Sequence, residues 1–292
     1  MGTEETQEIA FPEGEIQGRG DLENILVQAV REDKSILPEE LPDQLTSFGI
    51  ERYINWISEQ AKNDPRNREY AGELHIDANG RFIYSKRPNK GSEISVTPRV
   101  TKNYDKFATA VLVHTHPDST SFSDRDLLNV NLTIIQSVST TEFNYILIRN
   151  PEILIAEGES DKFREDSDEN QKEWAASIGG LRGTITGVVM RENGLTLNNP
   201  QGQKYKSIIL NLVKHMEVSI FGADLTRYMH TLDFARLTAN KYGLGFYYSE
   251  KDGIYRRVKP SFLNDFTTRV NQELVERAYQ ELPGKLAVIK EG

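Results

Sequence analysis

Apolar and polar positions follow two periods along the chain, and each change of period marks a change of predicted element. Apolar residues at helical spacing alternate with short apolar runs that are bounded by turn residues such as Asn79-Gly80. The elements predicted up to residue 156 are helices over 21–32, 50–62 and 124–137 and strands over 71–76, 81–85, 108–116, 144–149 and 153–156. This order predicts an α/β (α+β) fold with a mixed sheet flanked by helices.

The second half of the chain has a different pattern. Between Glu157 and Glu173 acidic residues outnumber basic ones, which is typical of a solvated linker or helix face. Beyond this run the pattern predicts hairpins that turn at Asn193-Gly194 and at Lys251-Asp252-Gly253, and helices over 202–218, 224–241 and 261–281. The predicted segments are a flexible leader with an N-terminal helix (1–45), a first domain (46–156), an acidic linker (157–180) and a mostly helical α+β C-terminal domain with hairpins (181–292).

Composition narrows the class of protein. A chain of 292 residues with 37% hydrophobic residues and a mean hydropathy of -0.55 is typical of a globular protein. Its 35 basic and 44 acidic residues give a net charge of -9, which argues against a nucleic-acid partner. Apolar runs are far shorter than the roughly 20 residues of a spanning helix, so no membrane partner is expected. With no cysteine, disulfides and thiolate metal sites are excluded, and the cytoplasm is the simplest location.

Residues 111–126, VLVHTHPDSTSFSDRD, contain the chemistry. If the apolar run continues as a strand, its two-residue period places His114 and His116 on one face. Asp126 then supplies an oxygen ligand and leaves the fourth tetrahedral position to water, which is the arrangement of a catalytic metal site and indicates hydrolysis. Ser123 and Asp126 also form a capping box before Leu127, and a helix N-terminus is compatible with a metal site.

His-Thr-His-Pro, a short loop and Ser-x-x-Asp together resemble the JAB/MPN (JAMM) zinc metalloprotease superfamily, which includes deubiquitinating isopeptidases. The upstream glutamate of that motif matches Glu69 in Glu69-Tyr70-Ala71-Gly72, and residues 46–156 carry the resemblance. The loop between His116 and Ser123 has six residues, one fewer than is usual there. Residues 68–85, with their Asn-Gly turn, are similar to the shorter bacterial members.

The resemblance implies a role for each residue of the motif. His114, His116 and Asp126 would bind zinc (Zn²⁺), Glu69 would act as the base, and Ser123 would donate a hydrogen bond to the oxyanion. Glu73 is the alternative base, because it shares a face with Glu69 in an extended segment. Iron or manganese also suits two histidines and a carboxylate, so zinc rests on the resemblance.

The implied activity is hydrolysis of an amide bond in a protein or peptide substrate, including conjugates of a ubiquitin-like protein. Two alternatives are a catalytically silent MPN-type scaffold and a RadC-like or toxin-associated domain. The complete set of motif residues argues against the silent scaffold. His215 and His230 lie on predicted helices without a nearby ligand set, and we interpret them as ordinary helix residues.

Overall fold

The computed structural model describes most of the chain, in two compact units. The described residues are 19–31, 40–76, 80–85, 87–92, 96, 108–117, 121–123, 126–127, 133–150, 154–156, 158–196, 200–221, 231, 234–235, 237–239, 241–259 and 272–283. The first unit contains Met1–Arg164 and Phe234–Lys259, and the second contains Glu165–Asp233 and Pro260–Gly292.

The first unit is built on a nine-stranded mixed sheet in the order β1-β9-β8-β7-β6-β5-β2-β3, with β4 also paired to β2. Only β5 and β6 are parallel, and the other strand pairs are antiparallel. The strands are β1 (Gln44–Thr46), β2 (Tyr70–Ile76), β3 (Phe82–Tyr84), β4 (Asn89–Lys90), β5 (Ala108–Thr115), β6 (Ile135–Ser139), β7 (Asn144–Ile148), β8 (Gly245–Ser249) and β9 (Ile254–Arg257). The mixed α+β class is therefore confirmed.

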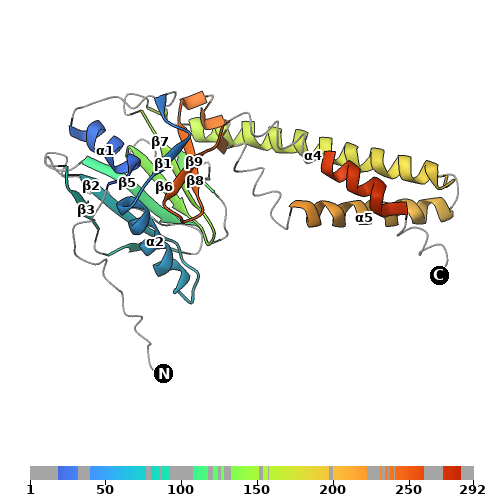
Figure 1. Ribbon diagram of the computed structural model, residues 1–292, viewed down its shortest axis with the longest axis horizontal. Coiled ribbons are helices and arrows are strands. Elements are labelled where there is room, and N and C mark those ends of the chain that lie inside the picture. Colours follow the sequence, from blue (N-terminus) through green and yellow to red (C-terminus); the bar gives the residue numbers. More distant parts are fainter. Residues whose placement is uncertain are drawn as a thin grey trace, which may run out of the picture. The chain divides into compact units, whose positions relative to one another are not determined.

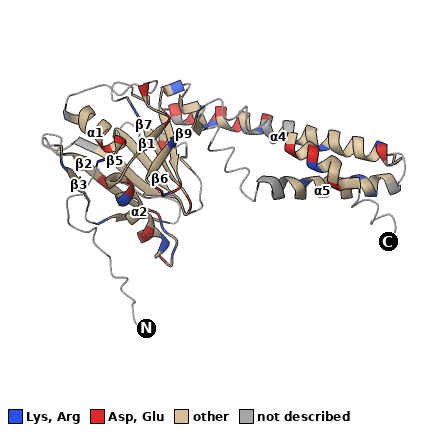
Figure 2. Ribbon diagram, viewed as in Figure 1, with Lys and Arg blue, Asp and Glu red and all other residues tan. Residues whose placement is uncertain are grey.

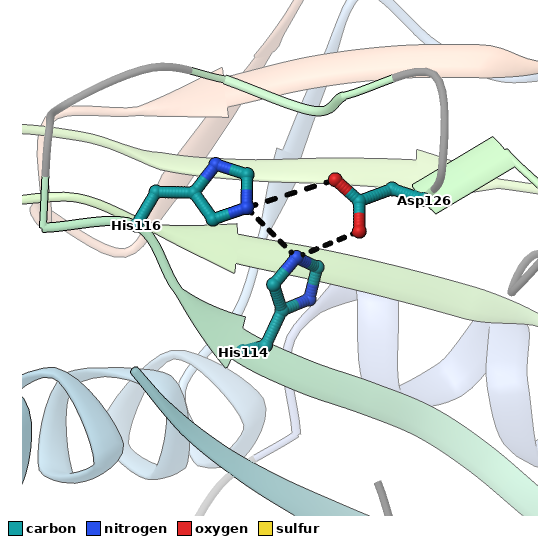
Figure 3. Close-up of side chains that lie close together, drawn as sticks. All are labelled: His114, His116 and Asp126. Carbon is teal, nitrogen blue, oxygen red and sulfur yellow. Dashed lines mark hydrogen bonds and ion pairs between the residues drawn. The ribbon is translucent and has the colours of Figure 1, made fainter. Parts of the chain in front are cut away.

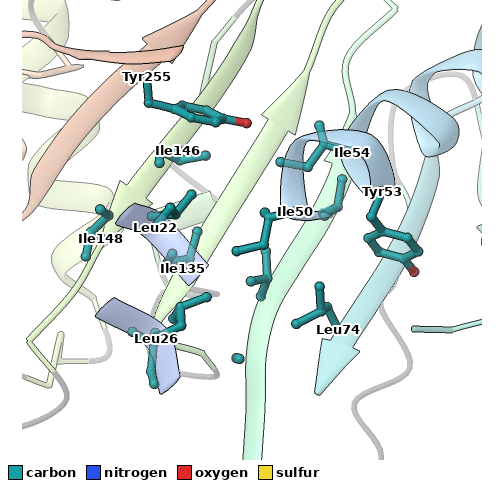
Figure 4. Packing of buried hydrophobic residues seen from close by; sticks show 14 of the residues in the cluster. Leu22, Leu26, Ile50, Tyr53, Ile54, Leu74, Ile135, Ile146, Ile148 and Tyr255 are labelled. Atoms are coloured by element: carbon teal, nitrogen blue, oxygen red, sulfur yellow. The ribbon is translucent and has the colours of Figure 1, made fainter. Parts of the chain in front are cut away.

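One face of the sheet is covered by α1 (Asp21–Arg31) and α2 (Gly49–Lys62), both close to their predicted bounds (Figure 1). Apolar residues of α2 recur at helical spacing and pack with Leu22 and Leu26 of α1 and Leu74 of β2 (Figure 4). Gly72 permits the close approach of α2, because a Cβ atom there would lie 2.4 Å from the Tyr53 hydroxyl.

The opposite face carries a cluster of aromatic rings. Phe246 of β8 lies 5.9 Å from Phe122, 6.0 Å from Tyr145 of β7 and 6.1 Å from Phe234, measured between ring centroids. Phe163, at the start of α4 (Glu159–Glu192), contacts Phe234 at 4.9 Å. Because strands β5 to β7 are covered on both faces, their described side chains are buried.

The described part of the second unit is helical and has its own apolar core. It contains the rest of α4, α5 (Pro200–Phe221) and a helical segment at 272–283. Ile185 and Val189 of α4 pack with Ile209 of α5 and Leu274. Along the described residues, no helix combines the length and the apolar character that a membrane crossing requires.

Of the two interpretations of the acidic segment, a linker or a helix face, the helix forms: α4 begins at Glu159 and continues through Glu173. Figure 2 shows that the charged residues of α4 are concentrated in its first half. Lys162 pairs with Glu159 at 2.8 Å and Arg164 with Asp161 at 2.6 Å, one helical turn apart, so opposite charges along the helix offset one another. The described compact units therefore divide the chain differently from the predicted domains.

The hairpin at residues 251–253 forms as predicted, but β8 and β9 extend the sheet of the first unit instead of belonging to a C-terminal domain. No local pattern reveals this, because β8 pairs with β7, about a hundred residues earlier. At Asn193-Gly194 the turn joins two helices, so the β-hairpin predicted there is wrong; Gly194 adopts φ 66 as α4 ends.

Three further boundaries differ or remain untested. The helix predicted over 124–137 is wrong at its end, where Ile135 begins β6. The apolar run there is compatible with either a helix or a strand, and pairing with β5 makes it a strand. Residues 154–156 are not a strand. Residues 1–18 of the predicted leader, 224–230 of one predicted helix and 261–271 of another lie outside the described residues.

Candidate metal centre

Two histidines lie on one face of the sheet at the C-terminal end of β5. His114 lies opposite Val138 of β6, which in turn lies opposite Tyr145, so the imidazoles are on the face that carries the aromatic cluster. Thr115 points the other way, and its Oγ1 accepts a hydrogen bond from the Tyr70 amide at 2.9 Å. The strand period therefore brings the histidines together as the sequence predicted.

Asp126 completes a compact group with both histidines (Figure 3). The His114 and His116 Nε2 atoms are 3.1 Å apart. Asp126 Oδ1 lies 3.0 Å from His114 Nε2, and Asp126 Oδ2 lies 3.6 Å from His116 Nε2. All three side chains are at most 9% exposed. The loop after β5 thus returns a carboxylate to the two imidazoles.

Surrounding groups hold two of these ligands in place. His116 Nδ1 lies 2.8 Å from the Ser121 carbonyl oxygen, so Nδ1 carries the proton and donates it there. The lone pair of His116 is then on Nε2, the atom that faces Asp126. The Ser123 amide and hydroxyl both donate to Asp126 Oδ2, at 2.7 and 2.8 Å. The Ser123–Asp126 contact that the capping box predicts therefore also orients the Asp126 carboxylate beside the two imidazoles.

The electrostatics of the group are dominated by one carboxylate. Burial alone would lower the pKa of His114, but Asp126 and, more weakly, Glu69 outweigh it and raise that pKa. Burial would likewise raise the pKa of Asp126, but the two histidines and the Ser123 amide hold it well below its usual range. Asp126 is therefore an anion at neutral pH, which is the form in which a carboxylate binds a metal ion.

The donor set fits a divalent metal. In a tetrahedral zinc site with ligand distances of about 2.0 Å, ligand atoms are about 3.3 Å apart. The Nε2–Nε2 and Nε2–Oδ separations of 3.1, 3.0 and 3.6 Å bracket that value. Three protein ligands form one face of such a tetrahedron, so a fourth position remains for water or substrate. The group could hold a metal ion, and its donors alone do not select zinc over iron or manganese.

Glu69 and Glu73 have different surroundings. Glu69 is buried immediately before β2, where its amide donates to the Ser92 carbonyl oxygen at 2.8 Å. Ala71 pairs with His114 in antiparallel strands, so Glu69, two residues before Ala71, lies level with His116, two residues after His114. Glu69 is therefore at the same end of the sheet as the candidate metal group. Glu73 pairs with Leu112 and lies 3.3 Å from the His75 Nε2 atom. The carboxylate nearer the two imidazoles is that of Glu69, which affects the pKa of His114.

Sequence reasoning missed two features beside this group. The Ser121 carbonyl oxygen that orients His116 is a backbone atom, so no residue type signals it. Gln136 of β6 precedes Val138, the partner of His114, by two residues and is 1% exposed. Neither of its amide atoms has a hydrogen-bond partner among the described residues. A glutamine inside an apolar strand was a usable signal. No protein-family model, curated protein or solved structure matches the chain.

Proposed function

We propose that the protein is a zinc-dependent amide hydrolase of the JAB/MPN type that cleaves a peptide or isopeptide bond. The observation that carries the proposal is the buried triangle of His114, His116 and Asp126, in which hydrogen bonds direct the His116 Nε2 lone pair and the carboxylate inward. Glu69, a buried carboxylate at the same sheet end, supplies the remaining group that hydrolysis needs.

Each protein group has a definite task in this reaction. Bound zinc would supply a Lewis acid that polarises the amide carbonyl and activates water. The Glu69 carboxylate accepts a proton from the attacking water and delivers it to the leaving amine. His114, His116 and Asp126 would hold the metal ion, and the burial of these side chains limits the access of bulk water.

Ser123 has a more restricted task than its motif position implies. Its hydroxyl has one proton, which it donates to Asp126 Oδ2 at 2.8 Å. Donation to an oxyanion therefore requires this hydrogen bond to break, while the Ser123 amide keeps Asp126 oriented. We expect Ser123→Ala to retain metal and to lower the rate by about a hundredfold, as loss of one oxyanion donor does elsewhere.

Elemental analysis is the first test, on protein purified without added metal. We expect about one zinc per chain in the wild type, none in His114→Ala/His116→Ala, and full occupancy in the control His215→Ala, because His215 is an exposed residue of α5. No metal in the wild type, even after zinc is added back, would overturn the proposal.

Turnover is the second test. Peptide mixtures and conjugates of ubiquitin-like proteins should be cleaved by the wild type, while Glu69→Gln should keep its zinc and lose hydrolysis. Unchanged turnover in Glu69→Gln would transfer the role of base to Glu73. A protein that holds zinc and cleaves neither class of substrate would be the silent scaffold of the same type.

A further inference from the structure

A pocket of about 390 Å³ lies beside the candidate metal centre, entirely within the first unit. Its walls come from the C-terminal half of α2, from the ends of β5 and β6 and from the turn between β8 and β9. The residues that matter here are Asn55, Ser58, Lys62, His116, Thr140 and Lys251. Since His116 is part of the wall, the pocket and the candidate metal site share one residue.

The Lys251 ammonium is the central charge of this pocket. Its Nζ donates to the Thr140 carbonyl oxygen at 2.6 Å and to the Ser58 hydroxyl at 2.9 Å, and both acceptors also line the pocket. An ammonium has three N–H donors, and the described residues provide acceptors for two of them, which leaves one for a ligand. Burial lowers the pKa of Lys251, which is the direction expected of a cation that has lost part of its hydration.

The described lining of the pocket contains two lysines, Lys62 and Lys251, and one carboxylate, that of Glu59, in a chain with a net charge of -9. The Glu51 carboxylate, which is not part of that lining, also attracts the Lys251 charge. Hydroxyl and amide groups make up much of the remaining wall. This composition suits a small anion with two hydrogen-bonding oxygens, because one oxygen meets the ammonium and the other meets neutral donors.

Lys251 and the candidate metal ligand His116 contact the same short segment of the chain. The carbonyl oxygen that accepts from Lys251 belongs to Thr140, and the carbonyl oxygen of the preceding residue, Ser139, accepts from the His116 amide at 2.9 Å. Two consecutive carbonyls of one segment therefore contact the lysine and the metal-ligating histidine. His116 therefore belongs both to the candidate metal group and to the wall of the pocket.

We propose that this pocket is a subsite for a carboxylate of the substrate, next to the amide bond that the metal centre cleaves, with the Lys251 ammonium as its recognition group. The role of the pocket as a substrate subsite rests on the proposed hydrolysis, but the binding of a carboxylate at Lys251 does not. The carboxylate is either the C-terminal carboxylate of a peptide or the side chain of an aspartate or glutamate. A phosphate dianion suits the pocket less well, because the described residues of its walls include no arginine.

Three single-residue probes test the proposal: N-acetylalanine, which has a free carboxylate; N-acetylglutamate N-methylamide, which has a side-chain carboxylate; and neutral N-acetylalanine N-methylamide. Binding is followed by the NMR signal of ¹³C-labelled lysine, with Lys251 assigned by comparison with Lys251→Met. We expect one acidic probe to shift the Lys251 signal in a saturable manner and the neutral probe not to do so.

Matched variants make the assignment specific. Loss of the charge–charge hydrogen bond in Lys251→Met should weaken binding of the acidic probe roughly tenfold or more, and Lys251→Arg should restore part of it. Lys259→Met is the control, because Lys259 is exposed and pairs with Asp43. Since Lys251→Met also removes contacts to Ser58, the wild-type titration is read first, and it does not depend on how that variant folds.

The outcomes separate the subsite from the hydrolase. Preference for N-acetylalanine indicates a terminal carboxylate and a carboxypeptidase-like reaction, and preference for the glutamate probe indicates an acidic residue inside the substrate. Equal binding of acidic and neutral probes overturns the subsite. So does binding that survives in Lys251→Met and disappears in His114→Ala/His116→Ala, since the metal centre then holds the carboxylate. Carboxylate binding at Lys251 without any hydrolysis refutes the proposed function alone.

Discussion

Truncation of Glu23 to alanine removes the group that caps α2. Glu23 lies on α1, is 1% exposed, and its Oε1 atom accepts hydrogen bonds from the first residues of α2. The four donors to Oε1 are the Ser47 hydroxyl at 2.8 Å and the amides of Phe48, Gly49 and Ile50 at 3.0, 2.8 and 2.9 Å. The cap residue Phe48 supplies no side-chain cap of its own, so a carboxylate from another helix replaces it.

The magnitude follows from the donors that the truncation leaves buried. Phe48 is 55% exposed, so its amide recovers a water partner at little cost, whereas Ser47 is 1% exposed and its hydroxyl loses a buried acceptor. The amides of Gly49 and Ile50 are buried, and so is the Gly20 amide, which donates to Glu23 Oε2 at 2.9 Å. Each buried donor without a partner costs about 1–3 kcal/mol, and the lost interaction with the helix dipole adds to this. We expect Glu23→Ala to lower the free energy of unfolding by about 3 kcal/mol.

Urea unfolding followed by circular dichroism measures this change, with thermal melting as a second readout. For a unit of this size the melting temperature should fall by roughly 6–12 °C. Asp21→Ala is the matched control, because Asp21 is an exposed carboxylate of the same helix that accepts from Thr46 and should cost less than about 1 kcal/mol. A Glu23→Ala variant no less stable than Asp21→Ala would refute the reasoning.

Further predictions concern stability and metal. Gly72→Ala should destabilise by about 1–3 kcal/mol, because its methyl group would overlap Tyr53, whereas Gly187→Ala, with open space around it in a helix, should stabilise by about 0.5–1 kcal/mol in the same urea assay. Burial raises the pKa of Glu51 above its usual 4.5 more than its hydrogen bonds lower it, so the folded state binds that proton more tightly. Wild-type stability should therefore decrease as pH rises above about 4.5 relative to Glu51→Gln, and parallel curves from urea titrations at several pH values would contradict this. Gln136→Met should stabilise by about 1–2 kcal/mol, since it removes a buried amide without described partners; a less stable variant would mean that the amide is hydrogen-bonded in solution. Zinc at 100 times its dissociation constant should stabilise the protein by about 2.7 kcal/mol, and chelation should reverse the shift in calorimetry.

Features that depend on neighbouring residues could be predicted from the sequence. The strand period alone places His114 and His116 on one face, and one helical turn brings Ser123 to Asp126. The helices α1 and α2 and strands β2, β3, β5 and β7 follow from local periodicity in the same way. Their identity and approximate bounds were determined by the sequence, because backbone geometry relates each side chain to others a few positions away.

Only the tertiary structure decided what joins distant parts of the chain. The Lys251 ammonium meets Ser58 across 193 positions, Glu23 caps a helix that begins 26 positions later, and β8 pairs with β7 to complete the sheet. Glu69 and Glu73 also look equivalent along the strand until the pairing of β2 with β5 brings Glu69 alone to the row of His116. The physical reason is the same in each case. Strand pairing and helix packing depend on the summed burial and hydrogen bonding of the whole unit, and no short stretch of residues contains that sum.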